Sequence, residues 1–553
     1  MSARRPTAAH QHTAPPAGLP AGVEVYDTTL RDGSQQEGLS LTVDDKLKVA
    51  ERLDHLGVHW IEGGWPGANA KDTEFFRRAP RELDLNVSRL VAFGSTRRAG
   101  AKAQTDETLR HLLEAGTETV CIVGKAWDRH VTAALRTDLD EGVRMVADSV
   151  AYLKAAGLRV FFDAEHFFDG YRTNPGFSTR VLRAAMDAGA DTLVLCDTNG
   201  GTLPHDVEAV LGQVIPAFAG TQIGVHFHND GGTAVANTLA GVRLGATQVQ
   251  GCVNGYGERT GNADLTAAIP NLSLKMGVAT IPADRLGRLT AVSHHIAEVV
   301  NVTPHPQQPY VGASAFTHKA GLHTSAIARD REAYEHINPD TVGNGTRFVV
   351  SEMSGRSTIL LKAEELGLEL DDAALGDVLA MLKHLEHEGY HFEAADGSVE
   401  LLMRRAGGWK QDFFRLESFR VITEHRATPD AALGAEGEIV TEATIKLWVG
   451  DERIVATAEG HGPVNALDAA LRQAAGPRYP QLARVHLTDY RVRVLDSSRG
   501  TGSVIRVLLD TTDGDRNWST IGVSDNIIEA SWRALVDSVV FGLLHSPGAK
   551  DSD

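Results

Sequence analysis

The sequence predicts a (β/α)8 barrel over residues 23–278, then helical linker subdomains over 279–390 and a C-terminal α+β domain over 391–545. Short apolar or β-branched runs alternate with helical patterns eight times before residue 254, which is typical of a barrel. Polar residues gather where those runs end. The 553 residues also exceed what one hydrophobic core usually serves. Residues 1–22 and 546–553 are expected to be tails, and a doubly wound open sheet is the alternative to the barrel.

The predicted strands are apolar or β-branched runs at 23–27, 60–64, 89–94, 119–123, 159–165, 192–197, 222–228 and 248–254. Between them, residues 43–56 show the clearest helical pattern, with Leu47, Ala50 and Leu53 on one face. Thr42 precedes this helix as a plausible N-cap, and Gly57 follows it as a C-cap. The segments 106–115, 141–156, 179–188 and 234–244 repeat the plan.

The composition is that of an ordinary soluble globular protein, with 42% hydrophobic and 23% charged residues. A net charge of −18 argues against nucleic acid or an anionic membrane as a partner, because both need a basic surface. No apolar run approaches the roughly 18 residues of a membrane helix. The three cysteines, Cys121, Cys196 and Cys252, lie in apolar runs, which favours buried thiols over disulfides. We therefore expect a cytoplasmic protein.

Two distant segments contain residues that bind metals. His226 and His228 are two apart in a predicted strand, so their side chains point the same way. Asp32 follows the end of the first predicted strand. A carboxylate and two imidazoles form a mixed site with positions left open, which suits a catalytic divalent ion. A lone His-x-His is, however, more often an ordinary polar pair.

Other polar residues occur at the same ends of the predicted strands, where barrel enzymes carry their active sites. They are Asp27, Arg31, Glu62, Asp163, Glu165, Asp197, Thr198, Asn199 and the polar run 254–262. Thr198 or Asn199 alone could simply cap the next helix. Their joint position on one rim favours an active site.

Four motifs carry a resemblance to a known family. They are Asp-Thr-Thr-Leu-Arg-Asp-Gly at 27–33, His-Phe-His-Asn-Asp at 226–230, Gly-Glu-Arg-Thr-Gly-Asn at 257–262 and Phe-Thr-His-Lys-Ala-Gly-Leu-His at 316–323. With them, the chain after residue 22 resembles the metal-dependent Claisen-condensing acyl-CoA synthases, which include 2-isopropylmalate, homocitrate and citramalate synthases. Segment 61–69 looks like the (R)-citramalate synthase branch, because Trp65 departs from the Val-Gly-Phe-Pro-like segment of isopropylmalate synthases.

The resemblance implies residue roles. The metal ligands would be Asp32, His226, His228 and Asn262, holding one divalent ion, whether Mn²⁺, Mg²⁺, Zn²⁺ or Co²⁺. Arg31 would face the 2-oxo acid, Glu165 would order the cluster, Thr198 would hold the substrate carboxylate, and Asp163 and Trp65 would border the substrate. His323 and Tyr334 would be a catalytic pair supplied from beyond the barrel, with His318 as a competitor for His323.

The implied reaction condenses acetyl-CoA with pyruvate and water to give (R)-citramalate and CoA. His323 would remove a proton from the acetyl methyl, since an imidazole has a near-neutral pKa. The resulting enolate would attack the ketone, and the thioester would then be hydrolysed. The alternatives are a 2-isopropylmalate synthase using 2-oxoisovalerate and a catalytically inactive amino-acid sensor.

The C-terminal region contains a weak internal repeat. The helix-like segment 465–472 parallels 526–533, and each follows strand-like runs, which predicts a pseudo-duplicated ββα unit. Such a unit leaves one sheet face to bury, so it can pair with its twin or with another subunit. We expect a homodimer. By resemblance the domain would also bind an end-product amino acid, here isoleucine. Its turns offer free backbone donors before helices, at Gly460, His461 and Gly462, and at Ser524 and Asp525.

Overall fold

The structure is a computed structural model that describes residues 17–318, 326–327, 330–351, 354–426, 438–495 and 497–546. The chain divides into two compact units. The first runs to Phe316 and includes Ile337–Gly345, and the second contains Thr317–His336 and everything from Thr346 onward. Each unit is described here by itself.

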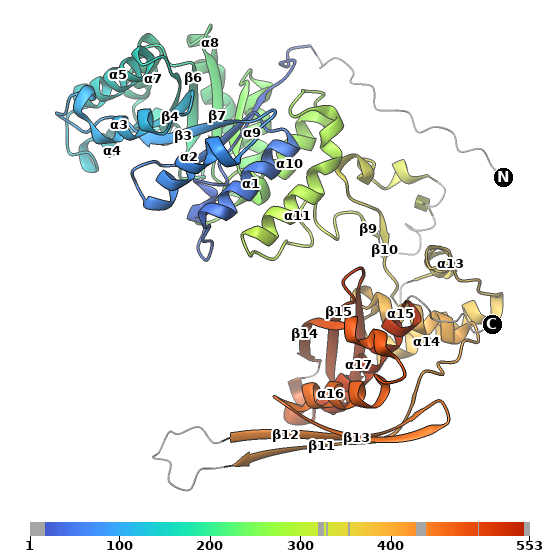
Figure 1. The fold of residues 1–553 in the computed structure, drawn as a ribbon. Helices are drawn as coiled ribbons and strands as arrows, with labels where there is room; N and C mark the ends of the chain where they lie inside the picture. The colour runs from blue at the N-terminus through green and yellow to red at the C-terminus, as the bar shows by residue number, and fades with distance from the viewer. Residues whose placement is uncertain are drawn as a thin grey trace. The chain divides into compact units, whose positions relative to one another are not determined.

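The first unit is a closed barrel of eight strands in the order β1 to β8, all parallel (Figure 1). Its strands are β1 (Glu24–Asp27), β2 (Trp60–Gly64), β3 (Arg89–Ser95), β4 (Thr119–Lys125), β5 (Arg159–Glu165), β6 (Thr192–Asp197), β7 (Gln222–Phe227) and β8 (Gln248–Gly251). Tyr26 pairs with Trp60 on one side and with Gln250 on the other, which closes the sheet. The predicted barrel is confirmed, and the open sheet is wrong.

Helices follow the strands and surround them (Figure 1). They are α1 (Val43–Leu56), α2 (Ala70–Glu82), α3 (Glu107–Glu114), α4 (Asp128–Ala133), α5 (Leu139–Ala155), α6 (Phe167–Thr173), α7 (Pro175–Asp187), α8 (Pro204–Ala217), α9 (Ala234–Arg243), α10 (Leu265–Pro270) and α11 (Leu289–Val299). Thr42 and Asp45 cap α1 reciprocally, each side chain accepting from the other's backbone N–H. Gly57 ends that helix at a φ of 94°, which glycine adopts without strain.

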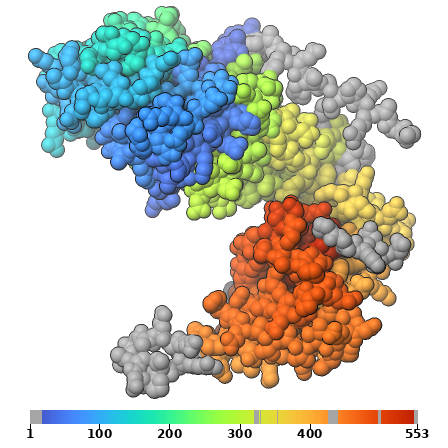
Figure 2. All heavy atoms as spheres, in the orientation of Figure 1, coloured from blue at the N-terminus to red at the C-terminus, as the bar shows by residue number. Residues whose placement is uncertain are grey.

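Alternate residues of each strand enter two separate cores, as the period of a strand requires. Tyr26, Phe93 and Phe161 pack together inside the barrel. Their neighbours Val25 and Ala92 pack outward in the core that includes the helices. In the space-filling view this part of the chain, blue to green, forms one continuous mass (Figure 2). All three cysteines are buried and free, as predicted.

A buried ion pair joins α1 to α2. The ammonium of Lys46 contacts the carboxylate of Asp72, and it also donates to the carbonyl of Gly63 at 3.1 Å. Asp72 in turn accepts from the backbone N–H of Trp65 at 2.8 Å. The pair therefore holds the turn that presents Trp65.

Lys46→Met is expected to destabilise the barrel, because it leaves a buried carboxylate without its charged partner. Such a loss costs about 3–5 kcal/mol in free energy of unfolding. Denaturant unfolding measures it, with Lys48→Met as the control, since Lys48 is exposed on the same helix. Equal stability of the two variants would contradict the prediction.

The second unit contains α13 (Arg356–Glu365), α14 (Asp372–His387), α15 (Asp396–Ala406) and two three-stranded antiparallel sheets. The first sheet has β11 (Arg415–Arg426), β12 (Glu438–Val449) and β13 (Glu452–Gly460), followed by α16 (Pro463–Ala475). The second has β14 (His486–Val494), β15 (Ile505–Thr512) and β16 (Asn517–Ser524), followed by α17 (Ile527–Leu544). Each half of the repeat thus has three strands, one more than the ββα unit predicted. A short parallel pair, β9 (Thr317–His318) with β10 (Arg347–Phe348), precedes these elements. Among the described helices, none is long and apolar enough to cross a membrane.

Candidate active site

Asp32, His226 and His228 meet at the C-terminal end of the barrel strands. The Nε2 atoms of the two histidines lie 3.6 and 3.7 Å from Oδ2 of Asp32, and 3.3 Å from each other. All three residues are buried. No other group of three possible protein ligands this close together occurs in the described part of the chain.

Asn262 comes to the same place through backbone pairing. It forms an isolated antiparallel bridge with His228, and its Nδ2 donates to the carbonyl of Tyr256 at 3.0 Å. Its Oδ1 is buried and, among the described residues, has no hydrogen-bond partner. A buried amide oxygen without a donor is costly unless it binds a ligand. This orphaned oxygen fits a metal ligand.

The protonation states also fit a divalent cation. Burial opposes ionisation of Asp32, but Arg31 and the two histidines lower its pKa to about 2. Burial, together with His226, lowers the pKa of His228 to about 4. The carboxylate is therefore charged and the His228 ring neutral at ordinary pH, which are the forms that bind metals. Two imidazole nitrogens with carboxylate and amide oxygens suit several divalent ions.

Gln250 of β8 orients His226. Its Oε1 lies 2.9 Å from Nδ1 of His226, and its Nε2 donates to Asp163 at 3.2 Å. With Nδ1–H donating to this oxygen, Nε2 keeps its lone pair toward Asp32. The structure thus places Asp163 behind the histidine. A contact of Asp163 with substrate stays a prediction.

Arg31 lies beside the cluster and between two carboxylates. Its Nη1 is 3.2 Å from Asp32, and its Nε donates to the fully buried Glu62. The hydroxyl of Tyr26 donates to the other oxygen of Glu62. The guanidinium carbon lies 3.8 Å above the ring of Phe93. Arg31 is thereby held in one orientation.

Trp65 packs edge-on against Phe93, with 5.4 Å between ring centroids. The guanidinium of Arg31 lies over the same phenyl ring. The aromatic pair therefore forms a wall next to the guanidinium.

Glu165 and Thr198 occupy the ends of β5 and β6. Glu165 forms an ion pair with Lys125 of β4. Thr198 Oγ1 accepts from the backbone N–H of His166 at 3.0 Å, and its carbonyl accepts from Arg259 at 2.8 Å. Arg259 also forms a bidentate pair with Asp230, at 2.8 and 3.0 Å. This arginine ties together the loops after β6, β7 and β8.

Gly261 shapes the loop that presents Asn262. Its φ is 86°, and an added Cβ would lie 1.9 Å from the carbonyl oxygen of Gly255. Gly261→Ala is therefore expected to displace Asn262 and weaken binding of a divalent ion about tenfold or more. Titration calorimetry with Mn²⁺ measures this. Gly38→Ala is the matched control, because Gly38 has a φ of 81° with open space around its Cβ position. Equal affinity in the two variants would contradict the prediction.

The remaining predicted residues belong to other parts of the chain. His323 lies outside the described residues. Tyr334 belongs to the second unit, where its side chain is 44% exposed. His318, the competing candidate for the role of His323, has its Nε2 3.7 Å from the buried carboxylate of Glu335.

The predicted regulatory turns precede α16 and α17. The backbone N–H of His461 donates to Asn465 at 3.1 Å, and Gly462 is the residue before α16, two after Gly460. Ser524 Oγ lies 3.4 Å from Asp525 and accepts from the N–H of Asn526 at 3.1 Å. Both turns are thus built by local side-chain hydrogen bonds.

Gln250 and Lys125 were not predicted as parts of the site, and Arg259 was predicted only as a member of the polar run 254–262. Gln250 has a polar side chain at an inward position of a buried strand, which is a signal that could have revealed it. Lys125 ends its strand just as Glu165 does. The partners of Arg259 could not be predicted, because they come from other loops.

Family comparisons agree along the chain. The HMGL-like family matches residues 22–295, the homocitrate synthase post-HMGL domain-like family 310–390, and the LeuA allosteric (dimerisation) domain 393–542. The (R)-citramalate synthase of Streptomyces coelicolor is 54% identical over 94% of this chain and 97% of its own length. That of Aquifex aeolicus is 48% identical over 94% and 98%. A probable 2-isopropylmalate synthase of Methanopyrus kandleri is 32% identical over 94% and 98%. The chain belongs to the family of these (R)-citramalate synthases.

Proposed function

We propose that this chain condenses acetyl-CoA with pyruvate and water to give (R)-citramalate and CoA. The observation that carries the proposal is the buried cluster of Asp32, His226, His228 and the orphaned Asn262 oxygen beside Arg31. The identity to (R)-citramalate synthases, 54% and 48% against 32% for the isopropylmalate synthase, supports pyruvate as the 2-oxo acid.

The residues divide the chemistry between them. A divalent cation held by Asp32, His226, His228 and Asn262 would supply Lewis-acid activation of the ketone. Arg31 donates hydrogen bonds where negative charge develops on the former ketone oxygen. The hydroxyl of Thr198 donates a hydrogen bond to the substrate carboxylate. Glu165, at the end of β5, helps to order the metal and the substrate. His323 is proposed as the base, with Tyr334 as its partner.

The wall formed by Trp65 and Phe93 favours a 2-oxo acid whose substituent is small. Two aromatic rings at a fixed angle do not make room for a branched chain without moving. Pyruvate carries only a methyl group. A second carboxylate, as in 2-oxoglutarate, would lie near the acidic groups Glu62 and Asp163.

CoA release tests the proposal, using protein supplied with metal, acetyl-CoA and one 2-oxo acid at a time. We expect the highest kcat/KM with pyruvate, compared with 2-oxobutyrate, 2-oxoisovalerate and 2-oxoglutarate. A preference for 2-oxoisovalerate would move the chain to isopropylmalate synthesis. No release with any acid would favour the amino-acid sensor.

We further propose that the region after the barrel, divided into a linker over 279–390 and a domain over 391–545, binds isoleucine as an inhibitor. A cavity of about 260 Å³ lies in this domain, lined by Val464, Leu487, Leu509, Leu535 and Val539. Asp468 and Arg472 also line it, paired through Oδ2 of Asp468 at 2.8 Å, while Oδ1 of Asp468 is buried with no hydrogen-bond partner among the described residues. An aliphatic side chain suits the apolar lining, and an ammonium group suits the carboxylate.

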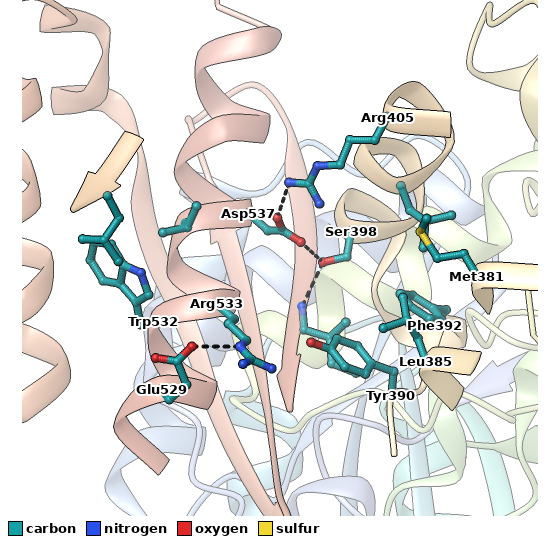
Figure 3. Close-up of a pocket in the computed structure, with 14 residues that line it drawn as sticks. Met381, Leu385, Tyr390, Phe392, Ser398, Arg405, Glu529, Trp532, Arg533 and Asp537 are labelled. Atoms are coloured by element: carbon teal, nitrogen blue, oxygen red, sulfur yellow. Dashed lines mark hydrogen bonds and ion pairs between the residues drawn. The ribbon is translucent and has the colours of Figure 1, made fainter. Parts of the chain in front are cut away.

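A larger cavity of about 360 Å³ lies between α14, α15 and α17 (Figure 3). Its charged groups already pair with each other, Arg405 with Asp537 and Arg533 with Glu529. Neither of these two carboxylates has a buried oxygen that lacks a hydrogen-bond partner among the described residues, so this cavity fits an ammonium group less well than the one lined by Asp468. Calorimetry with isoleucine and with leucine tests the proposed effector, and the absence of heat with isoleucine would contradict it.

Homodimerisation is proposed from the sheets of the second unit. Large apolar side chains are exposed on their strands, including Ile439 at 62%, Val455 and Val494 both at 53%. A sheet with large apolar side chains on an open face is stabilised when a second chain covers that face. Light scattering after size exclusion would report twice the chain mass, and a monomer at micromolar concentration would contradict the proposal.

A further inference from the structure

His166 stands in a backbone conformation that only a few residue types tolerate. It lies between the end of β5 and the start of α6, at φ 54° and ψ 35°, in the left-handed region. A residue with a Cβ is strained there, and β-branched residues most of all. Such strain persists only where the surroundings over-determine it, and it clusters at functional sites.

Side chains of α6, of α4 and of the residue before α4 contact His166. Its Nδ1 lies 3.5 Å from the carboxylate of Asp169, which accepts from Asn199 at 2.7 Å. The imidazole packs against His130, with 4.2 Å between ring centroids, and against Trp127 at 5.8 Å. The side chain is only 12% exposed.

The consequence of this conformation is a hydrogen bond to Thr198. The backbone N–H of His166 donates to Thr198 Oγ1 at 3.0 Å. A hydroxyl oxygen that accepts from this side keeps its own proton for a different acceptor. Arg259 holds the carbonyl of the same threonine at 2.8 Å. Thr198 is thus fixed at both its backbone and its side chain.

We propose that His166 is a positioning residue for the condensation, whose left-handed backbone aims the hydroxyl of Thr198 at the carboxylate of the 2-oxo acid. This rests on the proposed function, in which Thr198 contacts that carboxylate. The imidazole serves to hold the backbone, and the group that matters is the N–H.

His166→Val is the decisive variant, because a β-branched residue disfavours the left-handed conformation. It is expected to raise the KM for pyruvate about tenfold, the effect of losing one hydrogen bond to a charged group, while kcat changes less. His166→Gly and His166→Asn should rescue most of that loss, since glycine and asparagine adopt a positive φ. Arg136→Val is the control, because Arg136 is exposed and has the same φ of 54°. Its KM should not change.

A double-mutant cycle with Thr198→Ala separates the possible failures. In the Thr198→Ala background, His166→Val should add no further increase in KM. If Thr198→Ala itself leaves KM unchanged, the proposed contact of Thr198 with substrate is wrong. If Thr198→Ala raises KM but His166→Val does not, or if His166→Gly raises it as much as the valine variant, the positioning role is wrong. Even if the valine variant does not fold, a KM raised about tenfold in His166→Gly would contradict the positioning role.

Discussion

Asp32→Asn is expected to abolish CoA release. The change keeps the size of the side chain but removes the one carboxylate among the described residues that lies within 4 Å of both His226 and His228. Without that charge, two neutral imidazoles and an amide oxygen hold a divalent cation weakly. Loss of Lewis-acid activation is worth several kcal/mol, so kcat should fall by about 10³-fold or more.

Metal content measured by mass spectrometry distinguishes this cause from unfolding. The variant should fold, bind little Mn²⁺, and match the activity of wild-type protein treated with a chelator. Asp44→Asn is the control, since Asp44 is exposed on α1. An Asp32→Asn protein with full metal content and full kcat would refute the assignment of the site.

Arg31→Met is expected to have the second largest effect, and to affect both catalysis and stability. Removing a preorganised donor from a developing oxyanion costs about 10²–10³-fold in kcat. The same change leaves Glu62, which is fully buried, without its cationic partner. Burial already raises the pKa of Glu62. An uncompensated buried charge costs about 3–5 kcal/mol in free energy of unfolding.

The double variant Arg31→Met, Glu62→Gln separates these two effects. A neutral Glu62 replacement still accepts the hydroxyl of Tyr26, so the free energy of unfolding should return most of the way to wild type. The kcat should stay low. Recovery of kcat together with stability would show that Arg31 has only a structural role.

The barrel was predictable because buried parallel strands are apolar on both faces. Strands β2, β5 and β6 have the bounds predicted from such runs alone. The candidate ligands were predictable for a related reason. Asp32, His226 and His228 follow or end those runs, and parallel strands bring their carboxyl ends to one rim.

The remaining features depend on contacts between distant residues. Strand β11 has charged residues such as Arg415, Glu417 and Arg420 among its apolar ones, so it contains no strong apolar run. The hydrogen bond between Gln250 and His226 joins two neighbouring strands. The sequence of neither strand predicts the register in which they pair. The ion pair of Lys125 with Glu165 depends in the same way on the pairing of β4 with β5.

Reconstitution of chelated protein with a divalent metal tests the central claim most directly. CoA release from acetyl-CoA and pyruvate would be followed as Mn²⁺ or Mg²⁺ is added to wild-type protein and to Asp32→Asn. We predict that wild-type activity rises from near zero and saturates at one metal per chain, while the variant stays inactive. Full activity in the chelated protein, or equal reconstitution of the variant, would contradict it.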